Sequence, residues 1–203
     1  AVSNPYTSVF RDTLKLYGDA SISQIVVCRK PLSSGVQYLA RLLVTKKYNE
    51  LVSIYDRLYH SYAVLYLNDA NNTKLLLEKN ATLVLKPTDI ICSDGKRVGT
   101  TSKELQQLQV DTPRKLLAKI EKVMGASYDH YEMMHNNCQV FICNLLAVVR
   151  AWSLRDYFYQ PTGEVDQETK ALPQTVTNLY ARVSKAVDDT IASRFIDKTK
   201  PSR

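Results

Sequence analysis

The chain has 203 residues, of which 45% are hydrophobic and 23% are charged, with only 6 Gly and 7 Pro. This composition excludes a disordered or collagen-like chain, and the length excludes a large multidomain protein. The formal net charge is +7, with the basic excess at the two ends and no zinc-finger spacing or Arg-rich run, which argues against nucleic-acid binding and for a solvated basic surface.

The first quarter of the chain predicts an arm, a strand and two helical pieces. Residues 1–21 are polar and rich in Tyr, Ser and Thr, and we expect an N-terminal arm there. An apolar β-like run begins at Ile22 and ends before Pro31. Proline suits the first turn of a helix because its missing N–H would lack a partner there. We therefore predict a helix over 32–44, with a one-sided apolar stripe, and a second helical piece over 46–56.

The middle of the chain predicts a small antiparallel sheet. From His60 the run HSYAVLYLND is β-branched and aromatic, and turn-forming residues follow at 68–72. The return strand is expected over 73–79, and the run ATLVLK over 81–86 predicts another strand. We expect a connection after Pro87, with a short strand at Ile90–Cys92 and a turn at 93–96.

Two strong helices follow. Thr112 and Pro113 are a typical N-cap and first residue, and the first helix ends before Gly125. Its predicted buried stripe comprises Leu116, Leu117, Ile120 and Val123. The second helix is expected over 137–150. Its predicted buried stripe comprises Phe141, Leu145, Val148, Val149 and Trp152. Residues 153–203 are assigned to a C-terminal extension with an amphipathic helix, whose stripe runs from Val176 to Phe195.

The cysteines and the absence of long apolar runs bear on the compartment. Four scattered cysteines are too few for a disulfide framework and fit a reducing compartment, although one structural bridge is compatible with them. No run approaches the roughly 20 apolar residues that span a bilayer, and the first residues lack a signal-peptide pattern. Ala1 in place of Met is consistent with Met removal or with precursor cleavage. We expect a cytoplasmic or virion-associated protein.

The chemistry of the chain centres on Cys138. This residue follows two asparagines at the start of the second helix, where N–H groups and the helix dipole stabilise a thiolate. A cysteine nucleophile needs a base and a group that orients the base. His60 is the best placed of the three histidines because it begins a strand that can face the helix. His130 and His135 would reach Cys138 only by local folding back.

Glu78 is the expected orienting group. It lies eighteen positions after His60, on the return strand of the predicted hairpin, at the end of an apolar run. A carboxylate there needs a partner if it faces inward. The alternative is that Glu78 faces water beside Lys79.

These residues resemble a known family. YHSYAVLYL, a strand with Glu78 and then NNCQVFICNLL on a helix are similar to the circularly permuted papain-like (NlpC-type) superfamily. That superfamily includes the lecithin:retinol acyltransferase-like enzymes and related viral cysteine hydrolase-like domains. The most specific piece is Asn137 and Cys138 with Phe141 three residues later. The resemblance covers roughly 22–150, so we predict an α+β fold with the permuted papain-like domain over 22–152.

The resemblance implies a thiol-dependent hydrolase or acyltransferase that acts on an ester, thioester or amide through an acyl-enzyme. Cys138 would attack the carbonyl, His60 would accept and return the proton, and Glu78 would hold the imidazole tautomer. Backbone N–H groups at the start of the Cys138 helix would form part of the oxyanion hole. The lipid-acting branch commonly has a second histidine as third member. No histidine occurs near 70–80, which favours the branch with a glutamate.

Several alternatives stay open. Cys138, like Cys143, is also compatible with a small buried hydrophobe. The spacing of His130, His135, Cys138 and Cys143 does not match a zinc site, and no metal or cofactor is expected. Tyr128 and Tyr131 are placed either to lend an oxyanion hydroxyl or to pack.

The expected partner is an acyl-bearing substrate, either lipid or peptide. The basic termini suggest contact with a protein assembly or an anionic membrane. The alternative function is a structural or interaction protein, such as a component of a viral particle, with a retained but inactive papain-like fold.

Overall fold

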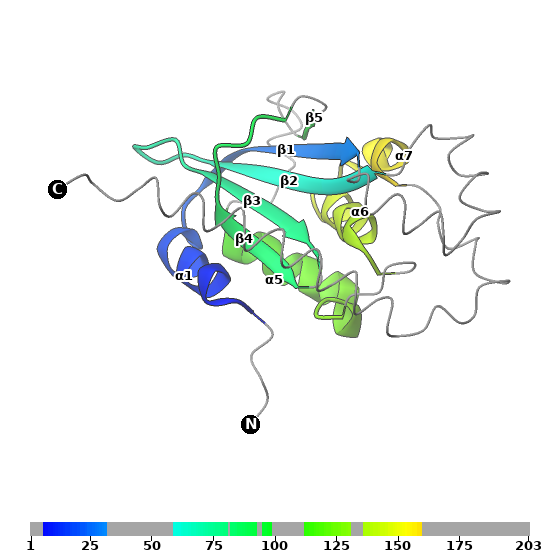
Figure 1. Cartoon of the computed structure of the whole chain (residues 1–203), viewed down its shortest axis with the longest axis horizontal. Coiled ribbons are helices and arrows are strands. Elements are labelled where there is room, and N and C mark those ends of the chain that lie inside the picture. Colours follow the sequence, from blue (N-terminus) through cyan, green and yellow to red (C-terminus); the bar gives the residue numbers. More distant parts are fainter. Residues whose placement is uncertain are drawn as a thin grey trace, which may run out of the picture.

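The computed structural model describes residues 6–31, 59–80, 82–92, 95–98, 112–130 and 136–159. These residues form a mixed α+β fold around one five-stranded antiparallel sheet (Figure 1). The strands are β1 (Ile22–Pro31), β2 (Tyr59–Leu67), β3 (Lys74–Lys79), β4 (Leu83–Pro87) and β5 (Gly95–Val98), in the spatial order β4-β3-β2-β1-β5. The helices are α1 (Ser8–Tyr17), α5 (Pro113–Met124), α6 (Cys138–Val148) and α7 (Arg155–Phe158), with 3-10 turns η1 (Gly125–Ser127) and η2 (Trp152–Leu154).

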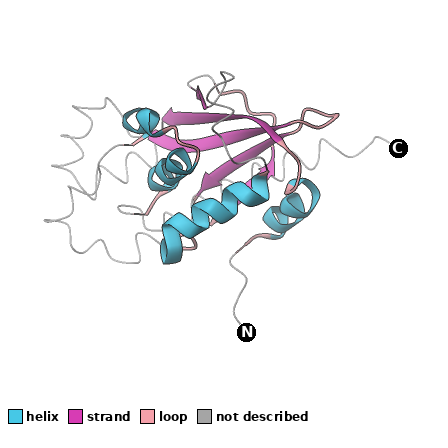
Figure 2. Ribbon diagram, turned by 180° about the vertical axis from the view of Figure 1, so that it is seen from behind, coloured by secondary structure: helices cyan, strands magenta, loops and turns pink. Residues whose placement is uncertain are grey.

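The helices pack on one face of the sheet. Figure 2 shows α5 and α1 along the lower side of the sheet, with α6 and α7 at the end of the sheet that is remote from α1. Side chains alternate between the two faces of a strand, so Leu75 and Leu77 of β3 join the core beneath the helices. That core also holds Phe141 of α6, while Leu76 belongs to a smaller cluster on the opposite face. The same alternation places Glu78 and Lys79, the last two residues of β3, on opposite faces.

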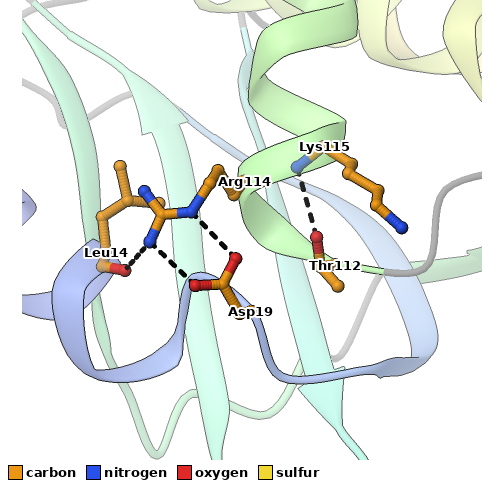
Figure 3. Close-up of polar contacts among 5 residues, drawn as sticks. All are labelled: Leu14, Asp19, Thr112, Arg114 and Lys115. Atoms are coloured by element: carbon orange, nitrogen blue, oxygen red, sulfur yellow. Dashed lines mark hydrogen bonds and ion pairs between the residues drawn. The ribbon is translucent and has the colours of Figure 1, made fainter.

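Within the predicted N-terminal arm over 1–21, residues Ser8–Tyr17 form helix α1 and pack with the domain. Thr7 caps the helix by accepting a hydrogen bond from the N–H of Phe10, whose ring is buried in the main core. Figure 3 shows how α1 meets α5: the Arg114 guanidinium donates to both carboxylate oxygens of Asp19 and to the carbonyl of Leu14. The segment is a helix because its apolar residues fall on one side and pack on the core.

Four of the five predicted strands exist with shifted limits. β1 continues to Pro31, which ends the strand and pairs with Tyr59, so the residue does not begin a helix there. Residues 90–92 are not a strand. β5 lies at Gly95–Val98 instead, where a turn was predicted, and pairs with β1. A Cβ at Gly95 would lie 2.7 Å from the Cβ of Cys92, so glycine permits this close approach.

The two strong helices are confirmed with corrections at their ends. Thr112 caps α5 and Pro113 begins it, as predicted, but Val123 is 58% exposed and does not belong to the buried stripe. α6 ends at Val148, and Trp152 lies in η2 with 53% of its surface exposed. The helix stripe therefore stops one turn earlier than the apolar pattern of the sequence.

The boundary at 153 also differs from the structure. Phe158 of α7 is 1% exposed and belongs to the main core, so the first residues assigned to the C-terminal extension pack with the domain. The hydroxyl of Ser61 donates to the carbonyl of Phe158 and ties α7 to β2. The helices predicted over 32–44 and 46–56, and the amphipathic stripe from Val176 to Phe195, lie outside the described residues.

Candidate active site

Cys138 is the first residue of α6. The side-chain oxygen of Asn137, the N-cap, accepts hydrogen bonds from the N–H groups of Gln139 and Val140 at 2.9 and 3.1 Å. This cap starts the helix at the nucleophile candidate and directs the positive end of the helix dipole toward its sulfur. Two of the N–H groups expected to help form an oxyanion hole are thus engaged by the cap.

His60 and Glu78 are held together at the end of the sheet. The ladder between β2 and β3 runs from the pair Tyr66–Lys74 to the pair Ala63–Leu77, and His60 lies beyond it on β2. His60 Nε2 lies 2.6 Å from Oε2 of Glu78, and both residues are buried. The alternative in which Glu78 faces water is wrong, because 4% of the residue is exposed and its side chain has a partner.

The thiol of Cys138 meets the imidazole of His60. The two side chains are hydrogen-bonded, and the backbone N–H of Ser61 also donates to the sulfur. Since Nε2 of the imidazole faces Glu78, Nδ1 is the nitrogen left for the sulfur. Three residues that are far apart in the sequence therefore form one chain of contacts, from carboxylate to imidazole to thiol.

The electrostatics of this trio favour separated charges. Burial raises the pKa of the Cys138 thiol, but His60 and the Ser61 N–H outweigh burial and hold that pKa below its ordinary value. Burial lowers the pKa of His60, but the adjacent Cys138 and Glu78 outweigh burial and raise it to about 10. Burial likewise raises the pKa of Glu78, yet His60 and the nearby Lys30 hold it below the usual range. Together these shifts favour a thiolate beside an imidazolium and a carboxylate over the three neutral groups.

A second buried network supports the site from the other face of β3. Lys79 is 2% exposed, and its Nζ donates to the carbonyl of Ser127 at 2.6 Å and to Oδ1 of Asn136 at 3.2 Å. The Asn136 amide donates in turn to the carbonyls of Ser127 and His130. This network holds the residue just before the α6 cap. The sequence offered only the unusual position of a lysine after an apolar run as a signal for it.

The other sequence candidates lie elsewhere. His130 contributes its backbone carbonyl to the Asn136 network, while His135 and Tyr131 lie outside the described residues. Tyr128 packs in the main core, and burial raises the pKa of Cys143 to about 11. Arg155 lies near Cys143 but does not outweigh burial, so this thiol lacks the depressed pKa of Cys138.

Across the described ranges, no three His, Cys, Asp or Glu side chains are grouped to hold a metal ion. Within the same ranges, no helix is long and apolar enough to cross a bilayer. A disulfide joins Cys28 of β1 to Cys92, so a single bridge accompanies the two free thiols, Cys138 and Cys143.

No protein-family model, curated protein or solved structure matches the chain. The chemistry of the site must therefore be inferred from its own contacts. A buried thiol with a depressed pKa, a hydrogen-bonded imidazole and a carboxylate behind the imidazole are the parts that nucleophilic catalysis by cysteine requires.

Proposed function

We propose that the protein is a thiol-dependent hydrolase or acyltransferase in which Cys138 is the nucleophile, His60 the general acid and base, and Glu78 the orienting carboxylate. The observation that carries this proposal is the buried 2.6 Å contact between His60 and Glu78, with the Cys138 thiol bonded to the same imidazole. The order His, Glu, Cys along the chain, and the cysteine at the start of a helix beside the sheet, favour a permuted papain-like core.

The charges at the site define the reaction. The Cys138 thiolate attacks the carbonyl carbon of an ester, thioester or amide and forms a C–S bond, and the carbonyl oxygen takes the negative charge. The His60 imidazolium then gives its proton to the leaving alcohol, thiol or amine, and the bond to that group breaks. Water or another acceptor attacks the resulting thioester, His60 takes the proton of that acceptor, and the thiolate leaves. Glu78 stays ionised and stabilises the imidazolium.

Removing the Cys138 sulfur tests the proposal. Cys138→Ala should abolish covalent labelling of the chain by a thiol-reactive acyl probe, and any turnover of a panel of ester, thioester and amide substrates. Cys143→Ala is the matched control, because it removes the other buried free thiol and should keep both activities. Mass spectrometry of the labelled chain and turnover assays measure the two effects. Unchanged turnover in Cys138→Ala would contradict the proposal.

One observation favours a second candidate function. Cys138, His60 and Glu78 are 7%, 6% and 4% exposed, so a substrate carbonyl must gain access to a nearly closed site. The second candidate is a structural or interaction protein that retains these residues without turnover, such as a component of a particle. A folded chain whose Cys138 is inert to small acyl probes at neutral pH would favour this candidate.

A further inference from the structure

The nucleophile lies on a helix and its base lies on a strand, so the reaction depends on how these two elements are joined. The ladder between β2 and β3 ends at the pair Ala63–Leu77. Tyr59 and Ser61 of β2 lie beyond that pair, on the side where the start of α6 approaches. Alternate residues of a strand direct their backbone groups to the same side, so Tyr59 and Ser61 face the same neighbour.

The first two residues of α6 contact these two backbone groups. The Gln139 side chain donates from Nε2 to the carbonyl of Tyr59 at 2.8 Å, and the N–H of Ser61 donates to the Cys138 sulfur. Gln139 is 5% exposed, so its amide is held in a site largely screened from water. The start of α6 therefore hydrogen-bonds to β2 beyond the end of the β2–β3 ladder, where β3 does not pair with β2.

We propose that Gln139 is a positioning residue that fastens the start of α6 to the strand carrying His60 and thereby sets the contact between the Cys138 thiol and the imidazole. The inference rests on the proposed function and assigns a part of its site that the sequence did not single out. Gln139 follows Cys138 directly, and Tyr59 precedes His60 directly. One hydrogen bond therefore joins the nearest neighbours of both reacting groups, and small shifts of either group would weaken their contact.

Loss of this bond should change the thiol itself. In Gln139→Leu the tether is gone while a side chain of similar size remains, so the sulfur moves from the imidazolium and from the Ser61 N–H. The pKa of the thiol then rises toward its ordinary value of about 8.5. Gln139→Glu keeps the shape of the side chain but turns a carboxylate oxygen toward the Tyr59 carbonyl, and it should act in the same direction. This second variant keeps the test valid if Gln139→Leu does not fold.

The experiment is the rate of Cys138 alkylation by iodoacetamide as a function of pH, on the full chain. Chymotryptic cleavage after Phe141 separates Cys138 from Cys143 for mass spectrometry. We expect the alkylation rate well below pH 8 to fall roughly tenfold in both variants, which corresponds to a rise of about one unit in the thiol pKa. The rates should converge at high pH. Asn144→Leu is the matched control, because that amide donates to the carbonyl of Val140 and its hydrogen bond stays within α6.

The outcomes separate this inference from the proposed function. A low thiol pKa in the wild-type chain that stays unchanged in both Gln139 variants would overturn the inference alone. A merely structural role would lower the denaturation midpoint without moving the pH profile, and would overturn it equally. An ordinary thiol pKa in the wild-type chain would overturn the proposed function, and this inference with it.

Discussion

Glu78 and Lys79 are neighbours in β3, and both are buried. In water both side chains would be charged, but the surroundings in the fold favour the charged form of Glu78 and disfavour the charged form of Lys79. Glu78 faces His60, a partner that can carry the opposite charge, and the pKa of its carboxyl falls below the usual range. Lys79 donates to two neutral oxygens, those of Ser127 and Asn136, and burial lowers its pKa to about 8 although the charge of Asp129 acts in the opposite direction. Glu78 is therefore held in its charged form, whereas Lys79 releases its proton at a lower pH than an exposed lysine does.

The difference shows what holds a buried charge in place. An opposite charge compensates for the lost solvation of an ion, whereas neutral acceptors compensate only in part. The charged pair lies on the face of β3 that meets His60, and the neutral network lies on the opposite face, where Lys79 meets Ser127 and Asn136. We therefore expect changes at Glu78 to act mainly on reactivity and changes at Lys79 to act mainly on stability.

The largest effect is expected from removing the Glu78 carboxylate. Glu78→Leu should lower kcat/KM by roughly 100-fold or more, because the imidazolium loses its orienting charge. Glu78→Gln should fall between this variant and the wild type, because an amide can still bond to Nε2. Loss of the carboxylate lowers the pKa of His60, so the alkaline limb of the pH profile, expected near pH 10, should move to lower pH. If the alkaline limb stays at the same pH in Glu78→Gln, the proposed role of Glu78 beside His60 is wrong.

The next effect is on stability. Lys79→Met should lower the free energy of unfolding by about 1–3 kcal/mol, because Oδ1 of Asn136 loses a buried donor. Lys74→Met, on the same strand and half-buried, is the control and should change stability less. Denaturant titrations measure both variants. Equal stabilities would show that the Lys79 network does not support the fold.

The pH dependence of stability sharpens the same contrast. The unfolded chain keeps the Lys79 proton up to about pH 10.4, but the folded chain releases it near pH 8, so this residue makes stability rise with pH across that window. His60 acts in the opposite sense: its contribution is complete below about pH 6.5 and is lost as the pH rises toward 10. Lys79→Met should therefore lose stability more steeply than the wild type between pH 8 and 10.

The smallest effect is expected at a charged pair remote from β3. Arg114→Ala removes the exposed ion pair with Asp19 and the bond to the Leu14 carbonyl (Figure 3). Exposed ion pairs contribute little because water solvates both charges. Stability should change only slightly, and alkylation of Cys138 should not change. A large loss of activity would mean that the α1–α5 junction reaches the site.

The local sequence predicted most elements of the described fold. Thr112 and Asn137 are caps whose side chains bond to the nearby backbone, so three or four residues suffice to predict where α5 and α6 begin. The predictions from the local sequence were wrong where contacts between distant residues decide the secondary structure. β5 forms because Gly95 can approach Cys92 beside β1, and α1 is a helix because Phe10 finds a place in the core. Trp152 fits the apolar period of α6, yet the helix has already ended.

Residue type and spacing identified Cys138, His60 and Glu78 as candidates, because a helix start, a strand start and an apolar run are readable from neighbouring residues. Their meeting was decided only by the tertiary structure. It depends on the register of β2 against β3, on the end of their ladder at Ala63–Leu77, and on the approach of α6 at that point. The support by Lys79 and Gln139 depends on backbone carbonyls 48 and 80 residues away, and carbonyls leave no mark in a sequence because every residue has one.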